Sequence, residues 1–243
     1  VGMVIDLPLL QEKLGIPVVG AALGRRRGLA EICAAIAAFE SGRYAAAAEA
    51  AQAFSRTQPN EPAAWQVLGI SAYYLGDLAT AAGAFDKLVK LERNNPEAWN
   101  NLALFRCELG ELDAAFKAAQ QALKLAPAMA EAHNNLGNIH RARHEHAQAE
   151  SSYRKAIDLG LQTPQVYCNL GSVLQEQGDY PAAREAYGRA IGLDADFAPA
   201  HSNLGGLLLI EGDMQAARDS LEKAYALTPD DVDVLGNLGE YWK

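Results

Sequence analysis

The sequence predicts an all-α protein, built as a solenoid of antiparallel helix pairs with about six full repeats and part of a seventh. Three observations predict this fold. The chain is similar to itself at a shift of thirty-four positions, without insertion or deletion from residue 28 onward. Glycine recurs at one position of nearly every repeat, where it would end a helix. Aromatic residues make up only 7% of the chain and alanine is frequent, which favours closely packed helices over a sheet.

The repeat boundaries follow from a motif of Asn, Leu and a small residue. Its five copies are equally spaced, at Asn101, Asn135, Asn169, Asn203 and Asn237. Numbering each repeat so that Trp65 is its fourth position divides the rest of the chain into the ranges 28–61, 62–95, 96–129, 130–163, 164–197, 198–231 and a partial 232–243. Residues 1–27 stand outside this pattern, so we expect two parts, an N-terminal segment of 1–27 and a repeat domain of 28–243.

Each repeat is expected to begin with a helix of about 13 residues. Three repeats start with proline, at Pro62, Pro96 and Pro164. Proline suits the first turn of a helix because an N–H there has no partner within the helix. The fifteenth position is glycine in five of six repeats and ends this helix in a left-handed conformation. Its occupants are Gly42, Gly76, Gly110, His144, Gly178 and Gly212.

The second helix of each repeat is expected to pack antiparallel to the first. Small residues at positions eight and twenty allow the two helices to approach closely, and a large residue at position twenty-four fills the space between them. Position twenty is always alanine: Ala47, Ala81, Ala115, Ala149, Ala183 and Ala217. The large residues at position twenty-four include Phe85, Tyr153, Tyr187 and Leu221.

This pattern resembles that of the tetratricopeptide repeat family, in which Trp, Leu, Gly, a large residue, Gly, Ala, an aromatic residue, Ala and Pro recur with the same thirty-four-residue period. The resemblance covers residues 28–243. It implies a right-handed superhelix whose first helices line a concave, protein-binding face. The chain departs from the family pattern at Arg93, Leu161 and Ala195, where a proline would be expected.

Asparagines mark this concave face. In such a stack, positions two, five, six, nine, twelve and thirteen of the first helices would meet a partner, and asparagine fills the sixth, exposed position in five successive repeats. A primary amide offers both a donor and an acceptor, which match the C=O and N–H of an extended peptide. We therefore predict that an extended peptide binds to Asn101, Asn135, Asn169, Asn203, Asn237, Asn100, Asn134 and Asn138. The alternative is that these asparagines hydrogen-bond between adjacent repeats and stiffen the stack.

The run of asparagines narrows the resemblance to the repeat arm of O-linked N-acetylglucosamine transferases, in which an asparagine ladder grips substrate polypeptide. Residues 133–138 and 197–205 are similar to that subfamily. A glycosyltransferase domain follows the repeats there, and none lies within these 243 residues. Three functions stay open: a peptide-binding scaffold, the substrate-recognition arm of a larger enzyme such as a glycosyltransferase, and a self-assembling scaffold.

No motif predicts catalysis or a cofactor. The sequence lacks HExxH, GxSxG, a phosphate-binding glycine loop and a dinucleotide fingerprint. Four of the five histidines fall in the fourth repeat, but His133 takes the packing position of Trp65, and His144 replaces a turn glycine. We expect no metal site.

Charge and cysteine content limit the partners and the compartment. A net charge of −9 argues against a nucleic-acid partner, and no apolar stretch is long enough to span a membrane. The concave positions lack the basic cluster that would clamp a partner's carboxylates. Cys33, Cys107 and Cys168 show no CxxC spacing, which favours a reducing compartment, the cytoplasm.

The two ends of the chain carry separate expectations. Residues 1–27 are apolar with a charge of +2, against −11 for the repeats. We expect this segment to cap the first repeat. The alternative is that it docks in the groove of another copy, which would make a homo-oligomer. The seventh repeat stops within its first helix, near Tyr241 and Trp242, which is typical of a chain that continues or whose missing half is supplied by a further domain.

Overall fold

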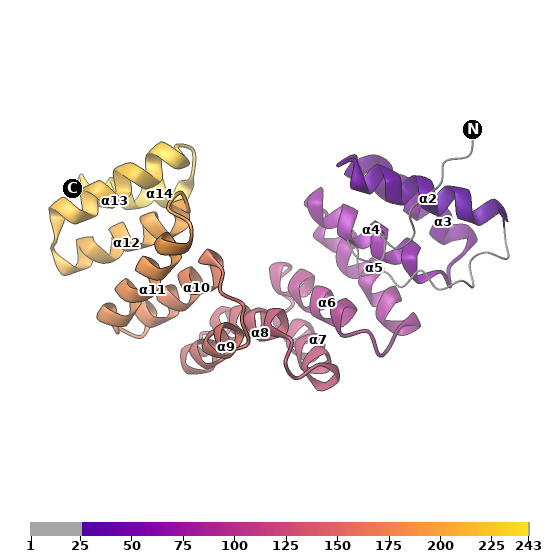
Figure 1. Cartoon of the computed structure of the whole chain (residues 1–243), viewed down its shortest axis with the longest axis horizontal. Helices are drawn as coiled ribbons and strands as arrows, with labels where there is room; N and C mark the ends of the chain where they lie inside the picture. The colour runs from indigo at the N-terminus through magenta and orange to yellow at the C-terminus, as the bar shows by residue number, and fades with distance from the viewer. Residues whose placement is uncertain (1–25, 243) are drawn as a thin grey trace. The chain divides into compact units, whose positions relative to one another are not determined.

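The computed structural model of the protein describes residues 26–242. Within this range the chain forms thirteen α-helices and no strand, so the predicted all-α repeat fold is confirmed (Figure 1). The helices are α2 (Arg26–Glu40), α3 (Tyr44–Thr57), α4 (Pro62–Tyr74), α5 (Leu78–Leu91), α6 (Pro96–Glu108), α7 (Leu112–Leu125), α8 (Ala130–Ala142), α9 (His146–Asp158), α10 (Pro164–Glu176), α11 (Tyr180–Leu193), α12 (Ala198–Glu211), α13 (Met214–Leu227) and α14 (Val232–Tyr241).

Helix beginnings follow the period of the sequence from α3 onward, whereas α2 begins at Arg26, two residues before the predicted start of the first repeat. From α4 onward, every even-numbered helix begins one full period after the previous one, and the odd-numbered helices from α3 to α13 do the same. Proline occupies the first position of α4, α6 and α10. Aspartates cap several second helices: the side chain of Asp77 accepts a hydrogen bond from the Thr80 N–H, and Asp179 and Asp213 cap α11 and α13 in the same way.

The turn between the two helices of a repeat is left-handed throughout. All five glycines at position fifteen have a positive φ, between 73° and 83°. His144 adopts the same conformation with φ of 60°, and it is the single non-glycine residue with positive φ in the described chain. The histidine therefore carries the strain that glycine avoids in the other repeats.

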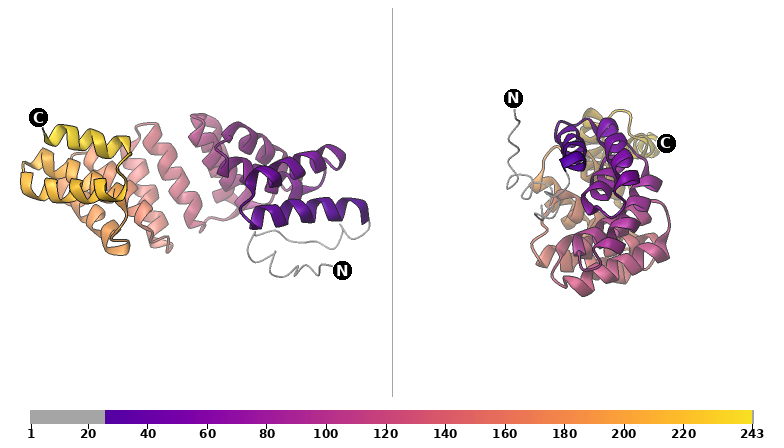
Figure 2. Two further views of the ribbon diagram at one scale, coloured as in Figure 1. Left: turned by 90° about the horizontal axis from the view of Figure 1, so that it is seen from above. Right: turned by 90° about the vertical axis from the view of Figure 1, so that its right-hand side faces the viewer.

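The described chain divides into two compact units, which meet in sequence after Gly110. The N-terminal unit contains α2 to α6, and its core includes Ile32, Phe54 and Leu68. The C-terminal unit contains α7 to α14, and its core is built around Tyr153 and Tyr187. Within each unit successive helices pack against each other, and α12, α13 and α14 lie side by side (Figure 2).

Small residues set the contact between paired helices, as predicted. All six alanines at position twenty are 0% exposed. Position eight is glycine in four of the six full repeats, and in each of these the large residue at position twenty-four lies directly over the glycine. None of the described helices is long and apolar enough to cross a membrane. The predicted N-terminal cap, residues 1–27, lies outside the described part of the chain except for Arg26 and Arg27, which begin α2.

Candidate peptide-binding groove

The C-terminal unit carries a groove face, which we define as positions six, nine, twelve and thirteen of α8, α10 and α12. A cavity of about 310 Å³ opens on this face. It is lined by Arg141, Ser172, Gln175, Glu176, Tyr180, Tyr187, Asn203 and Ile210. Six of these eight side chains come from the groove positions, because residues three and four apart share one face of a helix.

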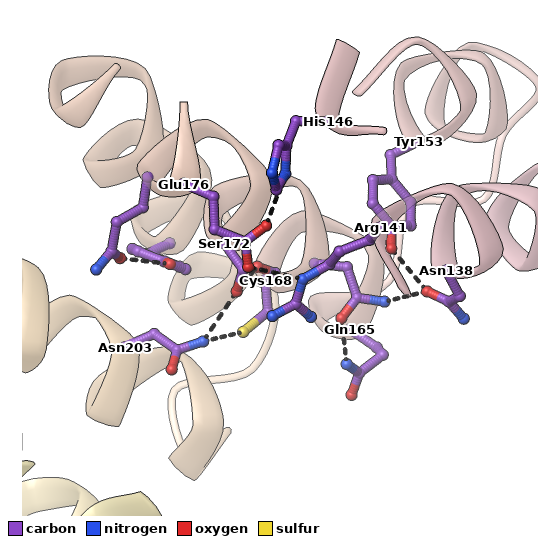
Figure 3. A network of polar contacts seen from close by, with 12 residues as sticks. Asn138, Arg141, His146, Tyr153, Gln165, Cys168, Ser172, Glu176 and Asn203 are labelled. Carbon is purple, nitrogen blue, oxygen red and sulfur yellow. Dashed lines mark hydrogen bonds and ion pairs between the residues drawn. The ribbon is translucent and has the colours of Figure 1, made fainter. Parts of the chain in front are cut away.

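Three of the five asparagines at position six donate hydrogen bonds to the preceding repeat. The Nδ2 of Asn169 lies 3.2 Å from Asn138 Oδ1. The Nδ2 of Asn203 lies 3.3 Å from both Ser172 Oγ and Cys168 Sγ (Figure 3). Asn237 repeats the arrangement with Nδ2 3.0 Å from Ser202 Oγ and 3.2 Å from Ser202 O. These asparagines thus link adjacent repeats, the structural role that we weighed as the alternative to peptide binding.

This linkage leaves different asparagines with different free groups. Asn169 also accepts a hydrogen bond from Gln165 Nε2 at 2.8 Å, so both ends of its amide are engaged within the unit. No described residue donates to Oδ1 of Asn203, which points away from Ser172 and Cys168 in Figure 3. Asn138 is engaged at the opposite end from Asn203: its Oδ1 accepts hydrogen bonds, and no described residue accepts from its Nδ2.

Burial differs along the predicted row as well. The expectation that position six is exposed is wrong at Asn135, which is only 7% exposed, and Asn100 at position five is equally buried. Asn101 and Asn134 are half-buried, and Asn134 Oδ1 is buried without a hydrogen-bond partner in the described chain. On the groove face, position thirteen is exposed, whereas positions nine and twelve are half-buried, like Asn169 and Asn203.

A charged cluster borders the cavity. Arg141 Nε lies 3.1 Å from Glu176 Oε1, and His146 Nδ1 lies 3.0 Å from the other oxygen of Glu176 (Figure 3). Burial raises the pKa of the Cys168 thiol to about 11 and that of Tyr187 to about 12. The two groups are therefore neutral at physiological pH and act as hydrogen-bonding groups in the floor of the groove.

Two tyrosines under the groove are functional candidates, although the sequence predicted only a packing role for them. Tyr153 and Tyr187 were predicted to fill the space between paired helices, and they are 0% and 1% exposed. Their hydroxyls pass beyond that space: Tyr153 Oη donates to Asn138 Oδ1 at 2.8 Å, and Tyr187 Oη donates to Gln175 Oε1 at 2.8 Å. The signal in the sequence was the choice of tyrosine rather than phenylalanine at position twenty-four.

The N-terminal unit presents a different surface, which we name the aromatic surface: Phe39, Tyr44, Tyr73 and Tyr74. The rings of Tyr44 and Tyr74 stack with centroids 4.5 Å apart and an interplanar angle of 11°. Phe39 lies 5.4 Å from Tyr44, and Tyr73 lies 6.0 Å from Tyr74. Tyr74 is 58% exposed. This surface offers stacking contacts rather than amide groups.

Two of the histidines, His133 and His201, take the packing position that tryptophan fills in other repeats. Trp65 Nε1 donates to Pro59 O at 2.8 Å, and Trp99 makes the same contact with Arg93 O at 2.9 Å. His133 and His201 place Nε2 3.0 Å from the equivalent carbonyls of Pro127 and Ala195. Within the described residues no three His, Cys, Asp or Glu side chains lie together as metal ligands.

The regular helix pairs and the left-handed turns define a helical repeat protein. Models of the tetratricopeptide repeat match residues 34–70 and 168–232, and also 95–162 and 128–195. Together these ranges take in well over half of the chain. The chain therefore belongs to the tetratricopeptide repeat family.

Solved structures agree with this assignment. The fold is similar to a chain of the APC/C hetero-tetramer Cut9–Hcn1, with 18% identity and a TM-score of 0.78 over 89% of this chain and 43% of that one. It is also similar to pilF of Pseudomonas aeruginosa, with 19% identity and a TM-score of 0.70 over 88% and 97%. YrrB, described as a TPR protein with an unusual peptide-binding site, has 24% identity and a TM-score of 0.55 over 67% and 84%. No curated protein matches the sequence.

Proposed function

We propose that this protein is an interaction module whose C-terminal unit binds an extended segment of a protein partner along the groove face. One observation carries the proposal: after the bonds between repeats are made, the face retains a donor on Asn138 and an acceptor on Asn203. The backbone of an extended peptide carries the complementary C=O and N–H at every residue. The groove therefore recognises backbone geometry before it recognises any side chain.

The family and one neighbour support this function. Tetratricopeptide repeat proteins mediate protein–protein interaction, and YrrB is described as having an unusual peptide-binding site. We infer that the chain is not itself catalytic and needs no cofactor or nucleic acid. The three unpaired cysteines favour a reducing compartment, the cytoplasm.

Two alternatives remain proposals. The first alternative is a role as the substrate-recognition arm of a larger enzyme. It rests on the resemblance of the linked asparagines Asn169, Asn203 and Asn237 to the repeat arm of O-linked N-acetylglucosamine transferases. The aromatic surface of the N-terminal unit favours the second alternative, self-assembly through residues 1–27. Light scattering of the full chain and of a variant without residues 1–23 separates self-assembly from binding a foreign peptide.

Asn138→Asp tests the proposed function with little disturbance to the fold. An aspartate keeps the oxygen that accepts from Tyr153 and Asn169, but it replaces the free donor with a second acceptor. Peptides selected on the wild-type protein from a displayed library of random 12-residue sequences serve as the probe. We expect Asn138→Asp to weaken their binding by about 10-fold, because a peptide carbonyl would then face an oxygen.

The matched control is Asn94→Asp, which makes the same change of charge at an exposed asparagine in the loop before α6. It should leave affinity within about two-fold of wild type. Equal affinity of Asn138→Asp and Asn94→Asp for every selected peptide would exclude the groove face as the binding site. A library that yields no peptide at all would argue against peptide binding itself.

A further inference from the structure

We infer that the hydroxyls of Tyr153 and Tyr187 fix which end of the groove amides faces a bound segment. The two tyrosines are positioning residues: they lie beneath the groove and act through Asn138 and Gln175. The consequence for binding rests on the proposed function, whereas the orientation of the amides does not.

The ring of Tyr153 packs over a glycine, which allows its hydroxyl to reach the groove. Its ring crosses from α9 over Gly137 of α8, and a Cβ at Gly137 would stand 2.6 Å from Tyr153 Cε1. Only glycine leaves room for this path. The phenolic oxygen thereby emerges beside the next residue of α8, where it donates to Asn138 Oδ1 at 2.8 Å (Figure 3).

Two hydrogen-bond donors hold the Asn138 amide in one orientation. Its oxygen accepts from Tyr153 and also from Asn169 Nδ2 at 3.2 Å. Turning the amide over would place its NH₂ against the NH₂ of Asn169, and the oxygen would lose both donors. The amide is therefore held with Nδ2 pointing away from Tyr153 (Figure 3). A donor rather than an acceptor is offered there.

The fifth repeat contains a second tyrosine whose hydroxyl donates to the oxygen of a groove amide. A Cβ at Gly171 would lie 2.6 Å from Tyr187 Cε1, so the ring follows the same path between α10 and α11. Its hydroxyl donates to Gln175 Oε1 at 2.8 Å, and Gln175 lines the cavity. Engaging the oxygen leaves the Gln175 amide nitrogen as the group offered to a ligand.

The other repeats show that packing alone does not require the hydroxyl. Phe85 lies over Gly69 and Leu221 lies over Gly205 in the equivalent contacts, and neither residue has a polar group. Both are as fully buried as the two tyrosines, at 1% and 0% exposed. The hydroxyl thus occurs in the two repeats where the residue above it is a groove amide.

Side-chain amide NMR spectra of the full chain test the orientation without a partner. Tyr153→Phe keeps the ring and removes the hydroxyl that donates to Asn138 Oδ1, so we expect the Asn138 and Asn169 side-chain NH₂ signals to shift and Asn138 to exchange between two orientations. Tyr187→Phe should shift the Gln175 signals and leave those of Asn138 and Asn169 unchanged. Tyr167→Phe, at position four of the fifth repeat, is the matched loss of a hydroxyl and should change none of these signals. Unchanged Asn138 and Gln175 signals in the two variants would overturn the inference.

Binding of the library-selected peptides provides the second readout. Tyr153→Phe should weaken them by about five-fold with an unchanged melting profile, and it should have no further effect in an Asn138→Asp background, where there is no donor left to orient. An effect of the same size in both backgrounds would assign Tyr153 a purely structural role. Failure to select any peptide would count against the proposed function, whereas the NMR result would still decide the orientation.

Discussion

Gly205 of α12 lies directly against Leu221 of α13: a Cβ at Gly205 would stand 2.6 Å from both Cγ and Cδ2 of the leucine. Leu221 is 0% exposed, so it has no free space into which to move. In the first repeat, alanine occupies both positions of this contact: Ala35 at position eight and Ala51 at position twenty-four, each 0% exposed. The sizes at positions eight and twenty-four are therefore matched within each pair.

Gly205→Ala is expected to destabilise the protein by about 1–3 kcal/mol, because overpacking outweighs the gain in helix propensity. Leu221→Ala should cost about 2–5 kcal/mol through the cavity that it leaves. The double variant reproduces the Ala35–Ala51 pair, so the alanine at 205 should cost nothing in the Leu221→Ala background. Urea denaturation of the four proteins measures this coupling, and strictly additive losses would contradict size matching.

The aspartate cap of α5 should make stability depend on acid pH. The hydrogen bond from Thr80 lowers the pKa of Asp77. A lowered folded pKa means that the cap contributes fully above the unfolded pKa, about 3.9, and is lost as the pH falls through the folded value. Asp77→Ala should cost about 1 kcal/mol at pH 7, and its difference from wild type should shrink below about pH 4. Asp77→Asn retains a cap without the charge, so its melting temperature should be near wild type at pH 7.

His133 should behave as a substitute for tryptophan. Its Nε2 contacts Pro127 O at 3.0 Å, as Trp65 Nε1 contacts Pro59 O at 2.8 Å. His133→Trp preserves a ring N–H and should keep or raise the melting temperature. His133→Phe leaves the carbonyl without this donor and should cost about 1 kcal/mol. Equal stability of the two variants would show that the hydrogen bond to Pro127 O contributes nothing measurable at this position.

Thiol reactivity should separate the three cysteines. Burial raises the pKa of Cys168 to about 11, and the residue is 3% exposed. At pH 8 roughly one Cys168 thiol in a thousand is then the reactive thiolate. Burial also raises the pKa of Cys33 and Cys107, but both are only half-buried. Mass spectrometry after iodoacetamide treatment should find Cys168 modified last, and early labelling of Cys168 would show that α10 and α12 separate readily.

The fold was predictable from the sequence because its signals are local. Proline at the first position, glycine at the fifteenth and aspartate after it each act on the backbone within a few residues, so their regular recurrence places every helix. The site was predictable only as a face. Which end of the Asn138 amide is free depends on Tyr153 and Asn169, which come from two other helices. The burial of Asn135 likewise depends on neighbouring helices, and a pattern of residue types along one helix does not contain that information.

Asn169 should matter more for stability than for binding. Its Nδ2 donates to Asn138 and its Oδ1 accepts from Gln165 at 2.8 Å, so both ends of the amide already make a hydrogen bond within the unit. Asn169→Ala should lower the free energy of unfolding by about 1–2 kcal/mol, since the acceptor on Asn138 loses one of its two donors. Asn138→Asp should lower stability less and affinity more, because it keeps that acceptor and removes only the free donor. Urea denaturation should therefore find Asn169→Ala the less stable variant, and peptide titration should find Asn138→Asp the weaker binder. If one variant were the more impaired in both assays, bonds between repeats and bonds to the peptide would use the same groups.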